Sequence, residues 1–257
     1  MFSIKDLSVV VTGGASGIGR AIAERFSAAG AKITIADTTE ASAFAGRIGG
    51  ASVIADVSRE ADVVRALETA RETFGRVDVL INNAGIQPLG VSLEATTEAL
   101  LQQTFSVNVN SVVFGTKHAP RFLPRGGRVI NTASFVGLIA APGIGVYGAS
   151  KAAVIHLTKI GAIELAKYGI TVNCVCPGTV ATPAVMDIPD NPEVAFIERT
   201  ALAGRLAQPE EIAAAFHYLA SPEAAYVTGH ALAVDGGMTA GMTEMDLPEW
   251  PPAASPR

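Results

Sequence analysis

Tyr147 and Lys151 are a pair of side chains whose types and spacing could support catalysis. They stand four residues apart in the stretch 147–168, whose pattern predicts a helix, so they share one helix face. A free phenol has a pKa of about 10, too high for a base at neutral pH. A neighbouring ammonium lowers that pKa, and Tyr147 is therefore expected to act as a general acid and base. Because such pairs also occur by chance, their meaning depends on the rest of the chain.

Ser134 is expected to lie beside this pair. It ends the run Asn131-Thr132-Ala133-Ser134, which closes a predicted strand 13 residues before Tyr147. In an open parallel sheet the carboxyl ends of the strands line the ligand crevice. Ser134 should therefore face the same cleft as any cofactor-binding turn at another strand end.

A glycine-rich turn follows the first predicted strand and opens the first predicted helix, with the sequence Thr12-Gly13-Gly14-Ala15-Ser16-Gly17-Ile18-Gly19. Its glycines at 13, 17 and 19 allow a tight turn, close approach of the backbone to a pyrophosphate, and close packing of helix on strand. The helix N-terminus offers free N–H groups to the anion. The spacing differs from that of the phosphate loop of kinases and ATPases, which argues against those classes.

Asp37 ends the second predicted strand, 18 residues beyond Gly19. A carboxylate there can accept hydrogen bonds from the adenosine ribose and repels a 2′-phosphate. The next residue is Thr38, and Ser16 in the glycine turn brings no cation either. The expected cofactor is therefore NAD and not NADP. The alternative for Asp37 is an ordinary turn residue at the end of a strand.

The elements that must position these residues alternate between strand and helix. Short β-branched runs predict strands at 8–12, 32–36, 52–55, 77–81, 128–132, 170–175 and 231–234. Longer Ala-rich stretches predict helices at 17–29, 59–74, 96–118, 147–168 and 208–220. This alternation predicts an α/β fold, a single-domain, doubly wound parallel sheet of Rossmann type with helices on both faces. We expect one NAD-binding and catalytic domain at 1–241, followed by a Pro-rich tail at 242–257.

Composition narrows the function further. The chain of 257 residues carries a net charge of −5 with only 17% charged residues, which argues against a nucleic-acid binder. No apolar run is long enough for a membrane span, and no secretory leader is evident, so a cytoplasmic location is expected. The surplus of Ala, Val, Ile and Leu is explained if outer helix faces are covered by other subunits. Cys174 and Cys176 should be buried small side chains, and the four histidines show no metal-ligand spacing, so no metal is expected.

Together these features resemble the classical short-chain dehydrogenase/reductase (SDR) family. The resemblance covers residues 4–240 and rests on ordered motifs: the TGxxxGxG turn at 12–19, Asp56-Val57, Asn82-Asn83-Ala84-Gly85, Asn108, Ser134, Tyr147 to Lys151, Asn173, Pro177-Gly178 and Asp235-Gly236-Gly237. Ala133 stands where many relatives have a second Ser, residues 38–50 shorten the helix after the second strand, and the tail extends past the usual end.

The resemblance implies roles for individual residues. Tyr147 is similar to the family's general acid and base, and Ser134 to the residue that orients the substrate oxygen. Lys151 resembles the lysine that binds the nicotinamide ribose and lowers the tyrosine pKa. Asn108 matches the asparagine that holds a water in a proton relay to that lysine. The catalytic set implied is Asn108, Ser134, Tyr147 and Lys151.

The same resemblance implies a cofactor set. Asp56 and Val57 are expected to flank the adenine, and the segment Pro177 to Thr182 to lie against the nicotinamide carboxamide and the diphosphate. The expected NAD-binding residues are Gly13, Ser16, Gly17, Ile18, Gly19, Asp37, Asp56, Val57, Asn83, Ala84, Gly85, Tyr147, Lys151, Pro177, Gly178, Val180 and Thr182. The resemblance also implies a homotetramer, or less often a dimer.

The expected function is transfer of a hydride between NAD and a small secondary alcohol, with a sugar, polyol or cyclic alcohol favoured. Reduction of 3-oxoacyl or steroid-type ketones is one alternative, and a non-catalytic NAD-binding regulatory module is another. Sugar-nucleotide epimerases share the fold but need a larger C-terminal domain than 257 residues provide. Candidate substrate-pocket residues are 87–89, 135–138, Ile144 and the segment 184–206, which reads as a flexible lid.

Overall fold

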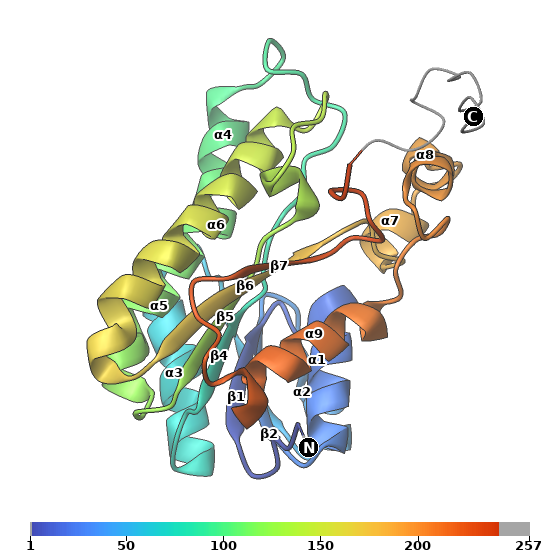
Figure 1. Cartoon of the computed structure of the whole chain (residues 1–257). Helices are drawn as coiled ribbons and strands as arrows, with labels where there is room; N and C mark the ends of the chain where they lie inside the picture. Colours follow the sequence, from blue (N-terminus) through green and yellow to red (C-terminus); the bar gives the residue numbers. More distant parts are fainter. Residues whose placement is uncertain (1, 242–257) are drawn as a thin grey trace, which may run out of the picture.

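The computed structural model describes residues 2–241 (Figure 1). The Pro-rich tail predicted at 242–257 lies outside the described residues. A parallel seven-stranded sheet forms the centre, in the order β3-β2-β1-β4-β5-β6-β7. Its strands are β1 (Ser8–Thr12), β2 (Lys32–Asp37), β3 (Ala51–Ile54), β4 (Val79–Asn82), β5 (Arg128–Thr132), β6 (Thr171–Pro177) and β7 (Ala231–Val234). The predicted fold class is confirmed.

The central strands are hydrophobic on both faces because helices cover both sides of the sheet. On β1, Val9 and Val11 belong to one apolar core, whereas Val10, between them, belongs to the other. All five residues of β1 are buried. This arrangement accounts for the continuous β-branched runs seen in the sequence.

Two groups of helices make the outer layers (Figure 1). One core contains residues of α1 (Gly17–Ala28), α2 (Ser42–Arg47) and α9 (Pro209–Ala220). The other contains residues of α3 (Glu60–Phe74), α5 (Ser111–Phe122) and α6 (Gly145–Leu165). The predicted shortening after the second strand is confirmed, since α2 has six residues.

The strand order reverses direction between β1 and β4, and this topology locates the ligand crevice. From β1 the chain winds outward to β2 and β3, then returns to β4 on the other side of β1. Parallel loops on the two sides diverge at such a switch point and leave a crevice at the carboxyl ends of the strands. The turn after β1 and the loop after β4 both lie at this point.

The predicted helix 96–118 is interrupted in the structure. It consists of α4 (Glu98–Phe105), a π-helical turn (Ser106–Asn110) and α5. A π turn accommodates one extra residue without ending the helix, and such turns often occur at functional sites. Sequence periodicity did not show this interruption, and it places Asn108 in the π turn.

The segment expected to be a flexible lid contains two helices, α7 (Pro183–Met186) and α8 (Pro192–Thr200). A parallel bridge between Val180 and Ala207 joins its two ends. The Ala181 N–H donates to Ala207 O at 2.9 Å, and the Ala207 N–H donates to Thr179 O at 3.0 Å. The lid is therefore a long insertion between β6 and α9 whose two ends are hydrogen-bonded to each other.

Other details follow the expectations closely. Cys174 and Cys176 are free and fully buried, which confirms their interpretation as small core residues. Strands β4 and β6 end one and two residues later than predicted. Within residues 2–241, no helix is both long enough and apolar enough to cross a membrane.

Candidate active site

The glycine turn after β1 has the conformation that its sequence demands. Gly13 and Gly17 have φ values of +64° and +52°, which side chains disfavour. A Cβ at Gly19 would lie 2.1 Å from the carbonyl oxygen of Gly13, so only glycine fits there. These glycines pack the turn tightly against the start of α1, and Gly13, Gly17 and Gly19 line a cavity there.

Asn83 and Thr12 hold this turn against the neighbouring strand ends. The Asn83 side-chain amide donates to the carbonyl oxygens of Thr12 and Gly13, at 3.0 and 3.2 Å. Its oxygen accepts from the Thr132 hydroxyl at the end of β5. The Thr12 hydroxyl accepts from the N–H groups of Asn83 and Ala84. Three strand ends are therefore joined by side-chain hydrogen bonds, which fixes the floor of the crevice.

A cavity of about 570 Å³ extends over this floor. Most of the predicted cofactor residues line it, namely Gly13, Ser16, Gly17, Ile18, Gly19, Asp37, Asp56, Val57, Asn83, Ala84, Gly85, Tyr147, Lys151 and Thr182. The glycine turn and the N-terminus of α1, which has no side-chain cap, suit a pyrophosphate. A carboxylate at the end of β2 suits ribose hydroxyls. The residues present therefore fit a nicotinamide dinucleotide.

Asp37 is fixed by main-chain donors. Its Oδ2 accepts from the Ala15 N–H in the glycine turn at 3.0 Å, and its Oδ1 accepts from the Thr39 N–H at 2.9 Å. A carboxylate has about four acceptor sites, so two remain for a ligand. The carboxylate thus also ties the end of β2 to the glycine turn.

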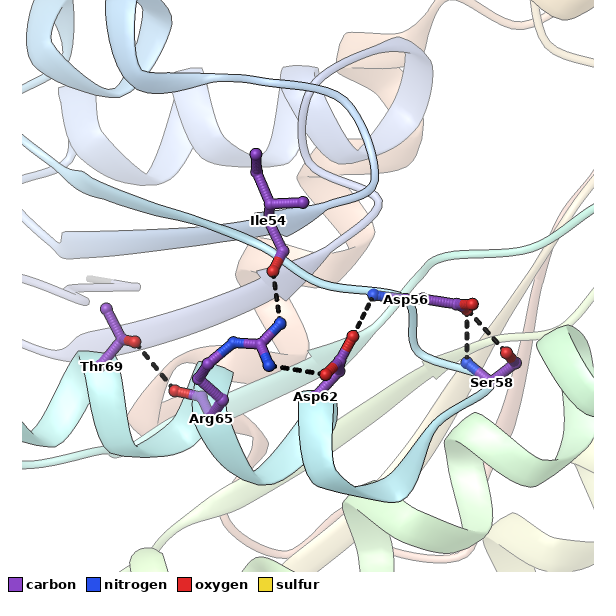
Figure 2. Close-up of polar contacts among 6 residues, drawn as sticks. All are labelled: Ile54, Asp56, Ser58, Asp62, Arg65 and Thr69. Atoms are coloured by element: carbon purple, nitrogen blue, oxygen red, sulfur yellow. Dashed lines mark hydrogen bonds and ion pairs between the residues drawn. The ribbon is translucent and has the colours of Figure 1, made fainter.

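Asp56 also lines the cavity and lies in the loop between β3 and α3 (Figure 2). Its Oδ1 accepts from the N–H and the hydroxyl of Ser58. Its own N–H donates to Asp62 Oδ2 at 2.9 Å, and Arg65 pairs with Asp62 and donates to Ile54 O. The hydrogen bond from the Asp56 N–H, and to a smaller extent that from Arg65, lower the pKa of the Asp62 carboxyl. The loop at Asp56 is thereby held to the first turns of α3.

Tyr147 lies where two cavities meet. A second cavity, of about 670 Å³, shares Tyr147, Thr132, Thr182, Ile18, Gln87 and Leu89 with the first. The rest of its lining is largely apolar and includes Phe135, Val136, Ile139, Ile144, Phe196, Ile197 and Met238. A ligand in the second cavity can therefore approach both the phenol and a dinucleotide in the first cavity.

Ser134 and Lys151 flank the phenol as predicted. Ser134 is buried, caps the short 3₁₀ turn Phe135–Gly137, and lines the second cavity. The Lys151 ammonium is 5.7 Å from the centre of the Tyr147 ring and donates to Thr132 O at 2.8 Å. A Cβ at Gly85 would lie 3.3 Å from Lys151 Nζ, so the small residue gives the ammonium room.

The pKa of Tyr147 differs from the expectation. The pKa is raised to about 12, chiefly by burial; the hydrogen bond with the Ser134 hydroxyl lowers it, and the Glu193 carboxylate raises it. Burial also lowers the pKa of Lys151 to about 8. The expected lowering of the phenol pKa by Lys151 is therefore wrong for the protein alone. Desolvation of the phenolate outweighs an ammonium that lies beside the ring and is engaged by Thr132.

Asn108 lies behind the cavity instead of lining it. Its Oδ1 accepts from the Ile86 N–H at 2.8 Å, and its Nδ2 donates to Ile86 O and to Ser150 Oγ. The Ser150 hydroxyl in turn donates to Tyr147 O. The Asn108 side chain thus connects the loop after β4 to the turn of α6 that carries Tyr147. A water relay at this residue stays a prediction.

The remaining expected cofactor residues belong to the loop after β6. Pro177, Gly178 and Val180 line the second cavity, whereas Thr182 lines both. The Thr182 methyl lies 3.3 Å from a Cβ built on Gly17, so this loop contacts the glycine turn. Two polar residues of the second cavity, Thr179 and Asn191, belong to segments that the sequence placed at the cofactor and at the substrate pocket, and neither was given a role of its own there.

Comparison with known proteins agrees with this geometry. A family model described as enoyl-(acyl carrier protein) reductase matches residues 13–239. The chain belongs to the short-chain dehydrogenase/reductase family. Like other SDR proteins, it has the fold and the nicotinamide-cofactor crevice of that family.

Individual SDR proteins resemble the chain over nearly its whole length. The 3β-hydroxysteroid dehydrogenase 2 of Eggerthella lenta is 39% identical and the alignment covers 91% of this chain and 95% of that protein. The mitochondrial borneol dehydrogenase of Lavandula x intermedia is 40% identical, with 93% of each chain covered. A short-chain dehydrogenase of Burkholderia cenocepacia, solved in complex with NADP, superposes with a TM-score of 0.85 at 33% identity, covering 92% and 99% of the two chains. These relatives are oxidoreductases, and those named for a substrate act on alcohols.

Proposed function

We propose that this SDR protein is an NAD-dependent dehydrogenase that oxidises a largely apolar, cyclic secondary alcohol. The observation that carries the proposal is the position of Tyr147 at the junction of a dinucleotide-sized crevice and an apolar cavity. Asn108, Ser134, Tyr147 and Lys151 form the proposed catalytic set.

In the proposed mechanism the alcohol lies in the second cavity with its hydroxyl toward Ser134 and Tyr147. Ser134 donates a hydrogen bond that orients the substrate oxygen, and Tyr147 accepts the proton of that hydroxyl. When bound, oxidised NAD supplies the hydride acceptor and a positive charge that favours the phenolate. Lys151, fixed by Thr132 O, holds a second positive charge near the phenol. Donors aimed at the developing alkoxide typically contribute a few kcal/mol each.

The proposal of NAD rests on Asp37. Its carboxylate keeps two acceptor sites for the ribose hydroxyls and repels a phosphate at the 2′ position. A solved relative binds NADP, so the distinction must come from this chain's own residues. Ser16 and Thr38 both line the crevice near Asp37 and carry no positive charge.

The proposal of a cyclic alcohol rests on the second cavity. Its apolar lining favours a cyclic alcohol over the sugars and polyols that the sequence left open. The similarity to a borneol and a hydroxysteroid dehydrogenase supports the same choice.

We also propose that the protein forms a homotetramer through α5 and α6. Val113, Ile160 and Ile163 are exposed on these helices beside a groove. Burial of such a patch against a second copy would remove apolar surface from water. The predicted cytoplasmic location stays a prediction from the sequence.

The test is a panel of cyclic alcohols, sugars, polyols and hydroxy acids with NAD and NADP, followed by nicotinamide absorbance. Tyr147→Phe should lower kcat by about 10²–10⁴-fold while NAD still binds. Tyr226→Phe is the matched control, because Tyr226 is fully exposed. Retention of most activity by Tyr147→Phe would refute the assignment.

A second candidate is the reduction of 3-oxoacyl or steroid-type ketones. The raised pKa of Tyr147, about 12, favours it, because the resting phenol is a proton donor at neutral pH. Assays in both directions distinguish the two. In the case of a non-catalytic regulatory module, NAD would bind without turnover of any panel member.

A further inference from the structure

The second cavity has an uneven distribution of charge. Among the described residues that line this cavity, Glu193 is the one with a charged side chain. The lining contains no Lys, Arg or His. Glu193 is half-buried there, and it brings a single negative charge to a lining whose other members are uncharged.

Glu193 is held in place by neighbours on both sides. The Thr179 hydroxyl donates to Glu193 Oε1 at 2.8 Å. The Glu193 N–H donates to Asn191 Oδ1 at 3.0 Å, and Asn191 Nδ2 donates to Val185 O at 3.0 Å. These contacts link α8 to the loop after β6 and to α7. Thr179 thus fixes one carboxylate oxygen.

The other oxygen, Glu193 Oε2, has no hydrogen-bond partner within residues 2–241. No ion pair to Glu193 is present there either. A carboxylate in the first turn of a helix is stabilised by the helix dipole, and this alone could explain Glu193. However, Glu198 on the same helix lies away from the cavity, whereas the charge of Glu193 reaches the phenol and raises the pKa of Tyr147.

We propose that Glu193 determines substrate specificity. Its free oxygen accepts a hydrogen bond from a second donor on the alcohol, a hydroxyl or an ammonium, and its charge excludes alcohols that carry a carboxylate or phosphate. This inference rests on the proposed alcohol oxidation at Tyr147. The substrate class is then an apolar ring alcohol with a second hydrogen-bond donor and no anionic group.

The test compares three ring-matched probes, namely cyclohexanol, 3-aminocyclohexanol and 3-hydroxycyclohexanecarboxylate, with the NAD-saturated full-length enzyme. Glu193→Gln keeps the shape and the acceptor for Thr179 but removes the charge. Glu198→Gln removes a charge from the same helix outside the cavity. Both kcat/KM and the dissociation constant by calorimetry are measured.

Relative to cyclohexanol, Glu193→Gln should raise kcat/KM for the carboxylate by about tenfold and lower it for the amine by about tenfold, as expected for one partly buried charge contact. Glu198→Gln should change neither ratio. The pH at which cyclohexanol oxidation reaches half its maximum should move to lower values in Glu193→Gln, because removal of the carboxylate eases ionisation of Tyr147. A carboxylate that acts only as a helix cap would not produce these changes.

The outcomes separate the two proposals. Suppose that cyclohexanol is oxidised, but the kcat/KM ratios of the amine and the carboxylate to cyclohexanol are the same in Glu193→Gln as in Glu198→Gln. This result would overturn the specificity role of Glu193 alone. Absence of both turnover and binding of all three probes by the wild type would overturn the proposed function and this inference with it. Altered ratios that are seen also in the dissociation constants would support direct contact with Glu193.

Discussion

Replacing Asp37 by Asn should change the cofactor preference of this enzyme. Asp37 accepts from the N–H groups of Ala15 and Thr39 with its two oxygens. An Asn at this position has one oxygen, so it can keep only one of these contacts and presents an amide group to the other donor. It also loses the charge that should bind the ribose hydroxyls and repel a 2′-phosphate.

The size of the change follows from two contributions. Loss of a hydrogen bond between a charged carboxylate and a ribose hydroxyl weakens NAD binding by about 1.5–3 kcal/mol. Removing the repulsion between the carboxylate and a 2′-phosphate, screened because Asp37 is only half buried, strengthens NADP binding by about 1 kcal/mol. Together they shift the preference by about 2.5–4 kcal/mol, or roughly 10²–10³-fold in the ratio of kcat/KM values.

The assay measures kcat/KM for NAD and NADP with one alcohol, and dissociation constants by fluorescence titration. Glu40→Gln is the matched control, because Glu40 is an exposed carboxylate three residues away that does not line the crevice. Thermal unfolding of each variant shows whether the lost contact with Ala15 has affected the fold. A cofactor ratio for Asp37→Asn within about threefold of that of Glu40→Gln would refute the role of Asp37.

Three further predictions concern the glycine turn, the buried Lys151 and the assembly. Gly19→Ala places a Cβ 2.1 Å from Gly13 O and should abolish NAD binding, measured by titration, whereas Gly46→Ala, where a Cβ meets nothing within 4 Å, should bind normally. Lys151 has a folded-state pKa of about 8 against an ordinary 10.5, so the unfolded state binds more protons between these values. The free energy of unfolding should therefore rise by about 3 kcal/mol from pH 8 to 10.5 in the wild type relative to Lys151→Met, as measured by urea titration; an equal pH dependence in both would contradict the assignment. Ile163→Asp introduces a charge at an apolar side chain that is 73% exposed on α6 and should dissociate the proposed tetramer in sedimentation, and an unchanged mass would argue against that interface.

Much of the predicted cofactor crevice could be located from the sequence, because the motifs that form it are short and local. The glycine turn, Asp37 and the polar residues after β4 each follow a strand directly, and parallel strands bring their carboxyl ends to one edge. Position along the chain therefore determines position in space. The helical spacing of Tyr147 and Lys151 is also a local signal, and it placed this proposed catalytic pair on one helix face.

The features of the site that the sequence did not reveal depend on contacts between segments that are far apart in the chain. The π turn at Ser106–Asn110 has no periodicity of its own, and the contacts of its residue Asn108 with Ile86 and Ser150 join segments that are far apart in the chain. The direction of the Tyr147 pKa shift depends on burial by several elements, which the spacing of Tyr147 and Lys151 does not report. Glu193 belongs to a segment that the sequence placed at the substrate pocket, but which of that segment's charged side chains lines the cavity depends on the packing of α8.

The bridge between Val180 and Ala207 has a consequence for how such enzymes diversify. Because the two ends of the lid are hydrogen-bonded to each other at the sheet, the residues between them can change in length or sequence with little cost to the strands. The glycine turn, Asp37 and Asn83 lie outside this segment, whereas Thr182, which lines the crevice and contacts Gly17, lies within it. A lineage that keeps Thr182 can therefore acquire a new substrate by exchanging the contiguous stretch of gene that follows it, while its coenzyme chemistry is inherited. The same boundary marks where a designer would graft the lid of another enzyme.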